Sequence, residues 1–307
     1  MKTRSKFHGI ILGIYADMIG IRYEKALLHL IRNKDAIDAH HRPALAKALR
    51  DTQKFEDVGL KWQDITGSND LWNRLQDHLG TKPYKFSDDT VLTCATIAAL
   101  NDNLSNPNFK KYYFEFGNNY RHAGFGPRFK QWINESEPGP AYGADTNGAI
   151  MRVSPIGYVD IDPTEKWTLA YNSASVTHNV PIAQNAAIQV VKLINSLQND
   201  KTLKASSEAY NLLYKDHKEL ISNLPQLSLQ QFDFKCESTY WNVLSVIWHS
   251  ISADNLIYNM IKTGGDTDTI GMVAGSIYGS QKDFYVPEHM QRYVYDNLPD
   301  ELRELIF

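Results

Sequence analysis

Residues 263–271 read Thr-Gly-Gly-Asp-Thr-Asp-Thr-Ile-Gly and set two carboxylates, Asp266 and Asp268, between a glycine turn and an apolar run. Two successive glycines let the backbone bend tightly. The apolar residues that continue from Ile270 to Tyr278 predict a buried helix. The two acids are therefore expected at the N-terminal end of that helix, which we call its mouth.

This helix carries a glycine at every fourth position. The spacing places the glycines on one side, where another backbone can approach closely, and it indicates a central helix: Gly271, Gly275 and Gly279. Residues 7–20 predict a second buried helix, whose small residues also predict tight packing against a neighbouring helix. Its acid, Asp17, lies among apolar residues and serves either a structural hydrogen bond or catalysis, because an unpaired buried acid costs several kcal/mol.

The stretch 266–269 has three competing interpretations. Asp and Thr cap helices and favour the positive end of the helix dipole, but one cap needs one such residue and not four. Asp-x-Asp-x-Thr is also the nucleophile motif of aspartate-based phosphotransferases, but that motif follows a hydrophobic parallel strand, and residues 259–265 predict none. We favour the third interpretation, oxygen ligation of a hard divalent cation.

The same arrangement occurs a second time, at residues 87–90, which read Ser-Asp-Asp-Thr and lead into an apolar helix over 91–100. Ser87 is a good N-cap, and Asp88 and Asp89 suit the first turn, so capping alone explains this stretch. Two such mouths facing one another supply four carboxylates and two hydroxyls. That set is sufficient to hold two Mg²⁺ or Mn²⁺ ions.

Three further positions are candidates for ligand contacts. The Gly-Phe-Gly turn at 124–126 either presents backbone N–H groups to a phosphate or is an ordinary turn. Arg152 lies beside apolar residues and needs an acid or an anion, and we expect a core ion pair. His178 precedes Pro181 at a helix end, where it either caps the helix or projects into a cleft.

Bulk properties narrow the class of partner. The chain has 307 residues, a formal net charge of −3 and scattered Lys and Arg, which argues against a nucleic-acid or membrane surface. No stretch approaches the ~20 apolar residues of a membrane span. Cys94 and Cys236 have no neighbouring thiol in sequence and suit a reducing cytosol. We expect a cytoplasmic monomer that acts on a small molecule or a modified protein.

In order and spacing, these motifs resemble those of the ADP-ribosylglycohydrolase family from about Gly9 to Gly279. The matching elements are the helix Gly13 to Gly20 with Asp17, the pair Tyr23-Glu24, Ser87 to Thr90, Asn147 to Gly157, the pair Thr177-His178, and Gly264 to Thr269. Several elements in register are far more specific than any one of them.

The resemblance implies an all-α fold, a compact single-domain helical bundle over residues 1–307 with a metal site at helix mouths. The helical pattern read from the residues agrees. It also implies hydrolysis of the glycosidic bond between ADP-ribose and an acceptor, either a modified protein or a small ADP-ribosyl conjugate. The expected cofactor is a binuclear centre of two Mg²⁺ (or Mn²⁺) ions.

Site residues follow from the resemblance position by position. The implied metal ligands are Ser87, Asp88, Asp89, Asp266, Asp268 and Thr269. The implied catalytic residues are Glu24, Asp88 and Asp89, with Glu24 next to the scissile bond. The implied substrate-binding residues are Gly124, Phe125, Gly126, Asn147, Gly148, Met151 and His178.

The chain departs from the family pattern at three places. Ala16 replaces a glycine and Ser87 replaces a threonine, both conservatively, whereas the loop 143–148 differs from the usual Gly-Asn-Gly and bears on acceptor specificity. For Glu24, a surface salt bridge to Arg22 or Lys25 remains the plain alternative. Two rival functions also remain: a catalytically silent ADP-ribose-binding protein, and a metal-dependent phosphohydrolase acting on the diphosphate.

Overall fold

The computed structural model describes residues 7–32, 86–198 and 234–307, with the backbone alone for residues 22–32 and Lys262. Within these segments the regular structure is helical. They contain no strand, and one isolated bridge pairs Thr146 with Lys235. The all-α fold predicted from the sequence is therefore confirmed. No helix in the described segments is both long and apolar enough to cross a membrane.

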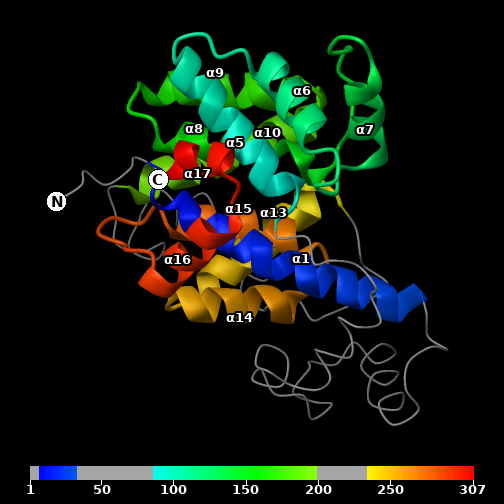
Figure 1. Ribbon diagram of the computed structural model, residues 1–307. Coiled ribbons are helices and arrows are strands. Elements are labelled where there is room, and N and C mark those ends of the chain that lie inside the picture. Colours follow the sequence, from blue (N-terminus) through cyan, green and yellow to red (C-terminus); the bar gives the residue numbers. More distant parts are fainter. Residues whose placement is uncertain (1–6, 33–85, 199–233) are drawn as a thin grey trace.

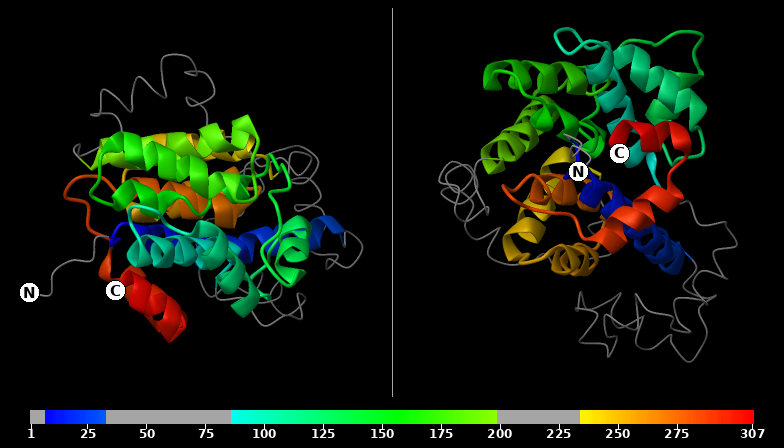
Figure 2. Two further views of the ribbon diagram at one scale, coloured as in Figure 1. Left: turned by 90° about the horizontal axis from the view of Figure 1, so that it is seen from above. Right: turned by 60° about the vertical axis from the view of Figure 1, so that its left-hand side comes forward.

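The helices lie in two groups, and the central helix α15 belongs to the second of them (Figures 1 and 2). One group comprises α5 (Asp88–Asp102), α6 (Phe109–Asn119), α7 (Pro127–Asn134), α8 (Ser154–Tyr158), α9 (Pro163–Ser175) and α10 (Pro181–Leu197). The other comprises α1 (Ile10–Arg32), α13 (Cys236–His249), α14 (Ala253–Thr263), α15 (Thr267–Tyr278) and α16 (Glu288–Asn297). A short 3-10 turn, η2 (Asn147–Ala149), precedes α8, and α17 (Asp300–Ile306) packs on α5.

Helix α15 is buried at every residue and packs most extensively against α1. A Cβ added to Gly275 would lie 2.7 Å from the Cα of Gly13, and one added to Gly279 would lie 2.2 Å from the carbonyl oxygen of Gly9. Glycine on both helices therefore sets the distance between them. The close approach predicted for each helix is confirmed, and the two helices are partners.

Helix α1 is longer than the sequence pattern suggested. We expected it to end near Gly20 and placed Glu24 just beyond it, but the helix continues to Arg32, so the backbone of Glu24 is helical. No glycine or proline interrupts residues 21–32, and extending an existing helix adds a hydrogen bond for each residue fixed. The side chain of Glu24 lies outside the described residues.

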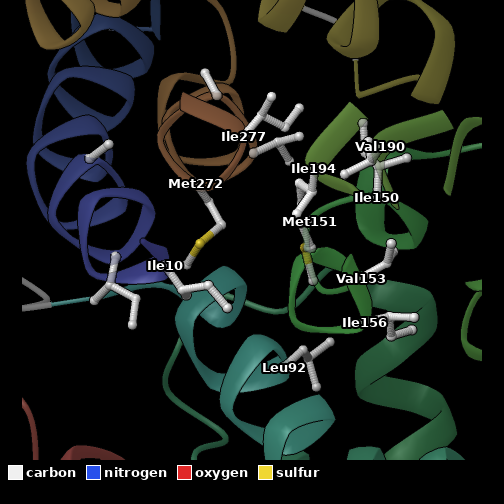
Figure 3. Packing of buried hydrophobic residues seen from close by; sticks show 14 of the residues in the cluster. Ile10, Leu92, Ile150, Met151, Val153, Ile156, Val190, Ile194, Met272 and Ile277 are labelled. Atoms are coloured by element: carbon white, nitrogen blue, oxygen red, sulfur yellow. The ribbon is translucent and has the colours of Figure 1, made fainter. Parts of the chain in front are cut away.

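The apolar core joins both groups of helices around α15. Figure 3 shows Met272 and Ile277 of α15 pointing into the same interior as Ile10 of α1, Leu92 of α5 and Ile194 of α10. Most residues of α5 are buried, as a helix that is apolar all round requires. Burial of α5 and α15 fixes their N-terminal ends in the interior, next to one another.

The helix break predicted at residues 177–181 is also present. Helix α9 ends at Ser175 and α10 begins with Pro181, since proline fits the first turn of a helix but not its interior. His178 lies in the connection between the two helices and is buried.

Candidate active site

A cavity of about 760 Å³ opens where the N-terminal ends of α5, α15 and η2 meet. Its volume lies in the range of small-molecule sites. Every site residue predicted from the sequence whose side chain the structure describes lines it: Ser87, Asp88, Asp89, Gly124, Phe125, Gly126, Asn147, Gly148, Met151, His178, Asp266, Asp268 and Thr269. Residues from 87 to 269 thus come together in one place.

The mouth of α5 is closed by its own N-cap. The Ser87 Oγ accepts a hydrogen bond from the backbone N–H of Asp89 at 3.1 Å and donates to Asp89 Oδ2 at 3.0 Å. Ser87 therefore caps the helix as predicted, and its hydroxyl proton is committed to the Asp89 carboxylate. Asp88, one residue earlier in the same turn, is only partly buried and lines the cavity.

Asp17 of α1 holds this mouth in place from behind. Its Oδ2 accepts hydrogen bonds from the backbone N–H of Ser87 at 3.1 Å and from the hydroxyl of Thr90. Burial raises the pKa of the Asp17 carboxyl. Of the two roles left open for Asp17, the structural hydrogen bond is confirmed.

The mouth of α15 is held differently. Asp266 occupies the N-cap position but makes no side-chain cap, and its Oδ2 instead accepts a hydrogen bond from the amide of Asn147. The same amide nitrogen also donates to Thr239 Oγ1 at 3.1 Å. The hydroxyl of Thr267 donates to the Gly20 carbonyl at 2.7 Å, which fixes the mouth to α1. Helix capping alone therefore does not account for Asp266.

The two mouths meet through a hydrogen bond in which Thr269 Oγ1 donates to Asp89 Oδ2 at 3.2 Å. This contact joins the first turn of α15 to the first turn of α5. The facing arrangement expected from the repeated motif is thus present. It brings Asp88, Asp89, Asp266 and Asp268 to one end of the cavity, which we call the acidic end.

Buried carboxylates at the acidic end repel one another. The pKa of Asp89 is raised well above its ordinary value, first by burial and then by the charges of Asp268, Asp17, Asp88 and Asp266. The pKa of Asp268 is likewise raised well above its ordinary value by burial and by Asp266. Removing carboxylates from water and crowding them both disfavour ionisation. A positive charge bound at the acidic end would therefore stabilise the ionised form of these carboxylates.

The donor set at the acidic end fits a hard divalent cation in its chemistry. Asp89 Oδ1 and Asp17 Oδ1 are buried and have no hydrogen-bond partner in the part of the chain that the structure describes, and oxygen donors are the ligands that Mg²⁺ and Mn²⁺ prefer. Among these same residues, however, no three His, Cys, Asp or Glu side chains are gathered closely enough to form a ready-made metal group. The binuclear centre stays a prediction.

His178 also lines the cavity, and hydroxyl groups lie within hydrogen-bond distance of both of its ring nitrogens. Nδ1 lies 2.7 Å from Thr177 Oγ1, and Nε2 lies 2.9 Å from Thr146 Oγ1. The ring also packs on Gly148, where an added Cβ would lie 2.9 Å from its Cε1. Burial, followed by the charges of Arg152 and Arg128, holds the pKa of His178 well below its ordinary value.

The core ion pair expected for Arg152 is wrong for the described residues. Its guanidinium lies 4.2 Å from the ring centroid of Tyr113. Its Nη2 donates to the Ser173 carbonyl at 3.1 Å and to Thr177 Oγ1 at 2.7 Å. An aromatic face attracts a guanidinium as an acid does, and a hydrophobic sequence pattern does not distinguish the two.

The turn 124–126 lies beside the acidic end. Gly124 has a φ of 112°, a conformation that favours glycine, and a Cβ there would lie 3.3 Å from Asp88 Oδ1. Gly126 is the N-cap of α7. The lining residues that sequence reasoning missed include Arg128, Tyr142 and Thr146. Of these, Arg128 had a usable signal, because it lies two residues after Gly126 of the glycine turn.

Comparison with known proteins identifies the family and the fold of this chain. ADP-ribosyl-[dinitrogen reductase] glycohydrolase of Rhodospirillum rubrum is 26% identical over 137 residues, which cover 44% of this chain and 45% of that protein, so the match spans about half the length of each. A solved structure titled "ADP-ribosylglycohydrolase-related protein complex" has the same fold, with a TM-score of 0.55 at 17% identity over 94% of this chain and 99% of that one. The family model for ADP-ribosylglycohydrolase matches residues 1–306. The chain belongs to the ADP-ribosylglycohydrolase family.

Proposed function

We propose that this chain hydrolyses the glycosidic bond between ADP-ribose and an acceptor, with two Mg²⁺ or Mn²⁺ ions held by Ser87, Asp88, Asp89, Asp266, Asp268 and Thr269. The observation that carries the proposal is the contact between Thr269 and Asp89 at the acidic end of a cavity of about 760 Å³. Family membership supports the class of bond, and the buried carboxylates support the cations.

When bound, the cations would offset the carboxylate charges and polarise oxygens of the ribose or of an attacking water. The protein's own residues orient that site. Asn147 and Thr269 donate to Asp266 and Asp89 and so fix one oxygen of each carboxylate. Asp17 fixes the backbone at Ser87. These ligand positions are thus held by hydrogen bonds, and Asp89 Oδ1 has no hydrogen-bond partner among the described residues.

Glycoside hydrolysis also needs proton transfer near an oxocarbenium-like transition state. Glu24 is our candidate for this role on the family pattern. Asp89 and Asp268 are poor candidates, because as metal ligands they must give up the protons that their surroundings favour.

The substrate of this reaction is an ADP-ribosylated protein side chain or a small ADP-ribosyl conjugate. A panel of defined ADP-ribosyl arginine, serine and acetyl substrates, incubated with Mg²⁺ and separately with Mn²⁺ and resolved by chromatography, tests the proposal. Release of intact ADP-ribose from one of them is expected. AMP and ribose phosphate as products would contradict it, since they require cleavage of the diphosphate.

A further inference from the structure

A second cavity lies beside the one that holds the candidate active site. It has a volume of about 680 Å³ and lies between helix α7 and the loop that follows it, residues 135–142. We call it the α7 hollow. Neither the sequence motifs nor the proposed reaction gives this hollow a role. Its lining comes from α6, α7 and the loop: Lys110, Arg128, Gln131, Trp132, residues 135–140 and Tyr142.

Trp132 holds the α7 hollow in shape. Its indole nitrogen donates a hydrogen bond to the carbonyl of Gly139 at 3.0 Å, which ties the loop to α7. The indole is buried and packs edge-on against Phe114, with 5.9 Å between the ring centroids. Pro138 and Pro140 flank the bonded glycine and restrict the backbone of the loop further. The hollow is therefore a preformed part of the fold.

The α7 hollow and the candidate active site share a wall. Arg128 and Tyr142 line both cavities, and Arg128 Nη1 lies 3.5 Å from the Tyr142 carbonyl oxygen. Gly124, which approaches Asp88 of the acidic end, precedes Arg128 by four residues, and four residues span at most about 14 Å of extended chain. The hollow thus begins close to the acidic end, where the proposed reaction separates the acceptor from ADP-ribose.

The charges that line the α7 hollow do not suit a second nucleotide. Glu135 and Glu137 contribute two carboxylates, and Lys110 and Arg128 contribute two cations. Two carboxylates in so small a space repel a phosphate. In the described part of the chain, the side chains of Lys110, Glu135 and Glu137 have no hydrogen-bond or ion-pair partner. They are therefore available to a ligand of mixed charge.

A polypeptide segment fits this lining in its chemistry. An extended main chain carries an N–H donor and a C=O acceptor at each residue and needs partners of both kinds. The amide of Gln131 supplies a donor and an acceptor, and Tyr142 supplies an aromatic face of the kind that lines peptide-binding grooves. Peptide side chains of either sign find an opposite charge in Lys110 or Glu137.

We infer that the α7 hollow binds the polypeptide next to the modified side chain, so that the substrate is an ADP-ribosylated protein and not a small ADP-ribosyl conjugate. The inference rests on the proposed function and narrows the substrate class that the proposed function leaves open. A small conjugate has no polypeptide to place in the hollow. The hollow should therefore favour a modified peptide and have no effect on the free conjugate.

Steady-state kinetics on matched pairs of substrates test the inference. One member of each pair is a short peptide with a single ADP-ribosylated arginine or serine, and the other is the same ADP-ribosyl residue as a free amino acid. For the wild-type chain we expect kcat/KM for the peptide to exceed that for the free residue by about 10-fold or more. Equal values overturn the inference and leave the proposed function intact.

Filling the hollow should remove this preference. Gln131→Trp should lower kcat/KM for the peptide about 10-fold and leave that for the free residue within about twofold. Lys130→Trp is the matched control, because Lys130 is the neighbouring exposed residue of α7 and lines neither cavity.

Ser136→Trp repeats the test from the loop, because Ser136 is exposed and also lines the hollow. Thermal unfolding of each variant, compared with wild type, separates a loss of binding from a loss of fold. Folded Gln131→Trp and Ser136→Trp variants that both process the peptide like wild type overturn the inference.

Calorimetric titration with ADP-ribose in the presence of Mg²⁺ separates the remaining outcomes. Gln131→Trp should leave this affinity within about twofold, since the hollow takes no part of the ADP-ribose. A loss as large as that for the peptide would assign the hollow to the nucleotide and overturn the inference alone. A wild-type chain that cleaves neither member of any pair would contradict the proposed function, and the inference with it.

Discussion

Thr269 donates a hydrogen bond to Asp89 across 180 positions of sequence, with 3.2 Å between Thr269 Oγ1 and Asp89 Oδ2. The bond ties the first turn of α15 to the first turn of α5. Both residues are buried, so the contact is held by the packing of two interior helices. Carboxylates that such packing forces together are destabilising on their own, and this property leads to the first prediction.

Asp268→Asn should raise the thermal stability of the metal-free protein near neutral pH. A raised pKa means that the folded state disfavours the charged form, so the penalty grows as pH rises above the ordinary Asp value and disappears on protonation. The amide keeps the shape and removes that charge. Thermal unfolding in excess chelator measures it, with exposed Asp160→Asn as the control.

The same substitution should abolish turnover if Asp268 holds a cation. We expect a loss of about 10³-fold or more, because a metal supplies several kcal/mol of transition-state stabilisation. A variant that is more stable without metal but inactive with it separates ligand loss from unfolding. Activity close to that of wild type would remove Asp268 from the ligand set.

The spacing of α1 and α15 should tolerate no side chain at their contact. Gly275→Ala places a Cβ 2.7 Å from the Cα of Gly13, where backbone rather than a flexible side chain must move. We expect a loss of about 1–3 kcal/mol in unfolding free energy, measured by denaturant titration. Gly139→Ala, whose Cβ would meet only Trp132 at 3.4 Å, is the matched control. Equal stability of both variants would contradict the packing described.

His178 should make stability depend on pH on the acidic side of neutrality. Its folded pKa is held below the ordinary value of about 6.5, so the unfolded chain binds a proton that the folded chain does not. The stabilising contribution is complete above about pH 6.5 and is lost as pH falls below it. The slope for one proton is about 1.4 kcal/mol per pH unit.

His178→Gln should flatten that slope between about pH 6.5 and 5. Unfolding free energies measured at several pH values, for wild type and variant, give the difference directly. His249→Gln on α13, where the ring bonds to the Ser245 carbonyl, controls for loss of a histidine elsewhere. Parallel curves for wild type and His178→Gln would show that His178 titrates normally.

Glu24→Ala should lower the rate by about 10²–10⁴, the usual effect of losing a general acid or base. Affinity for Mg²⁺ should change less, because Glu24 is assigned to proton transfer rather than to the ligand set. Steady-state rates at saturating metal, with metal affinity from calorimetry, measure the two effects separately. A rate within a few-fold of wild type would return Glu24 to a surface salt bridge, which is worth little.

A structural feature could be predicted from the sequence where its residues have a recognisable local pattern. The mouths of α5 and α15 were predictable because Ser87 and Asp266 stand where hydrophilic caps meet apolar helices, and helix starts have a local chemical signature. Their facing one another followed from the repeated motif. Gly13 and Gly275 predicted that each helix packs closely against another helix, because small residues on one face of a buried helix let another backbone approach. They did not predict that α1 and α15 are each other's partners.

Other features left no local signal. Thr146 and Tyr142 lie in an irregular loop, where no periodicity tells which side chains face a cavity. Arg152 finds the face of Tyr113 rather than an acid, and such a pairing depends on tertiary contacts alone. The end of α1 was misplaced at Gly20, because the pattern of small and apolar residues stops there, whereas the helix continues to Arg32 and Gly20 contacts the backbone of Thr267.

The central claim is metal-dependent cleavage of a glycosidic bond, and the most direct measurement is chromatographic. The chain is incubated with defined ADP-ribosyl substrates in Mg²⁺ or Mn²⁺, in parallel with excess chelator and with Asp266→Asn. We predict intact ADP-ribose from at least one substrate with metal, and none with chelator or with the variant. Full release in excess chelator, or AMP as the product, would contradict the account.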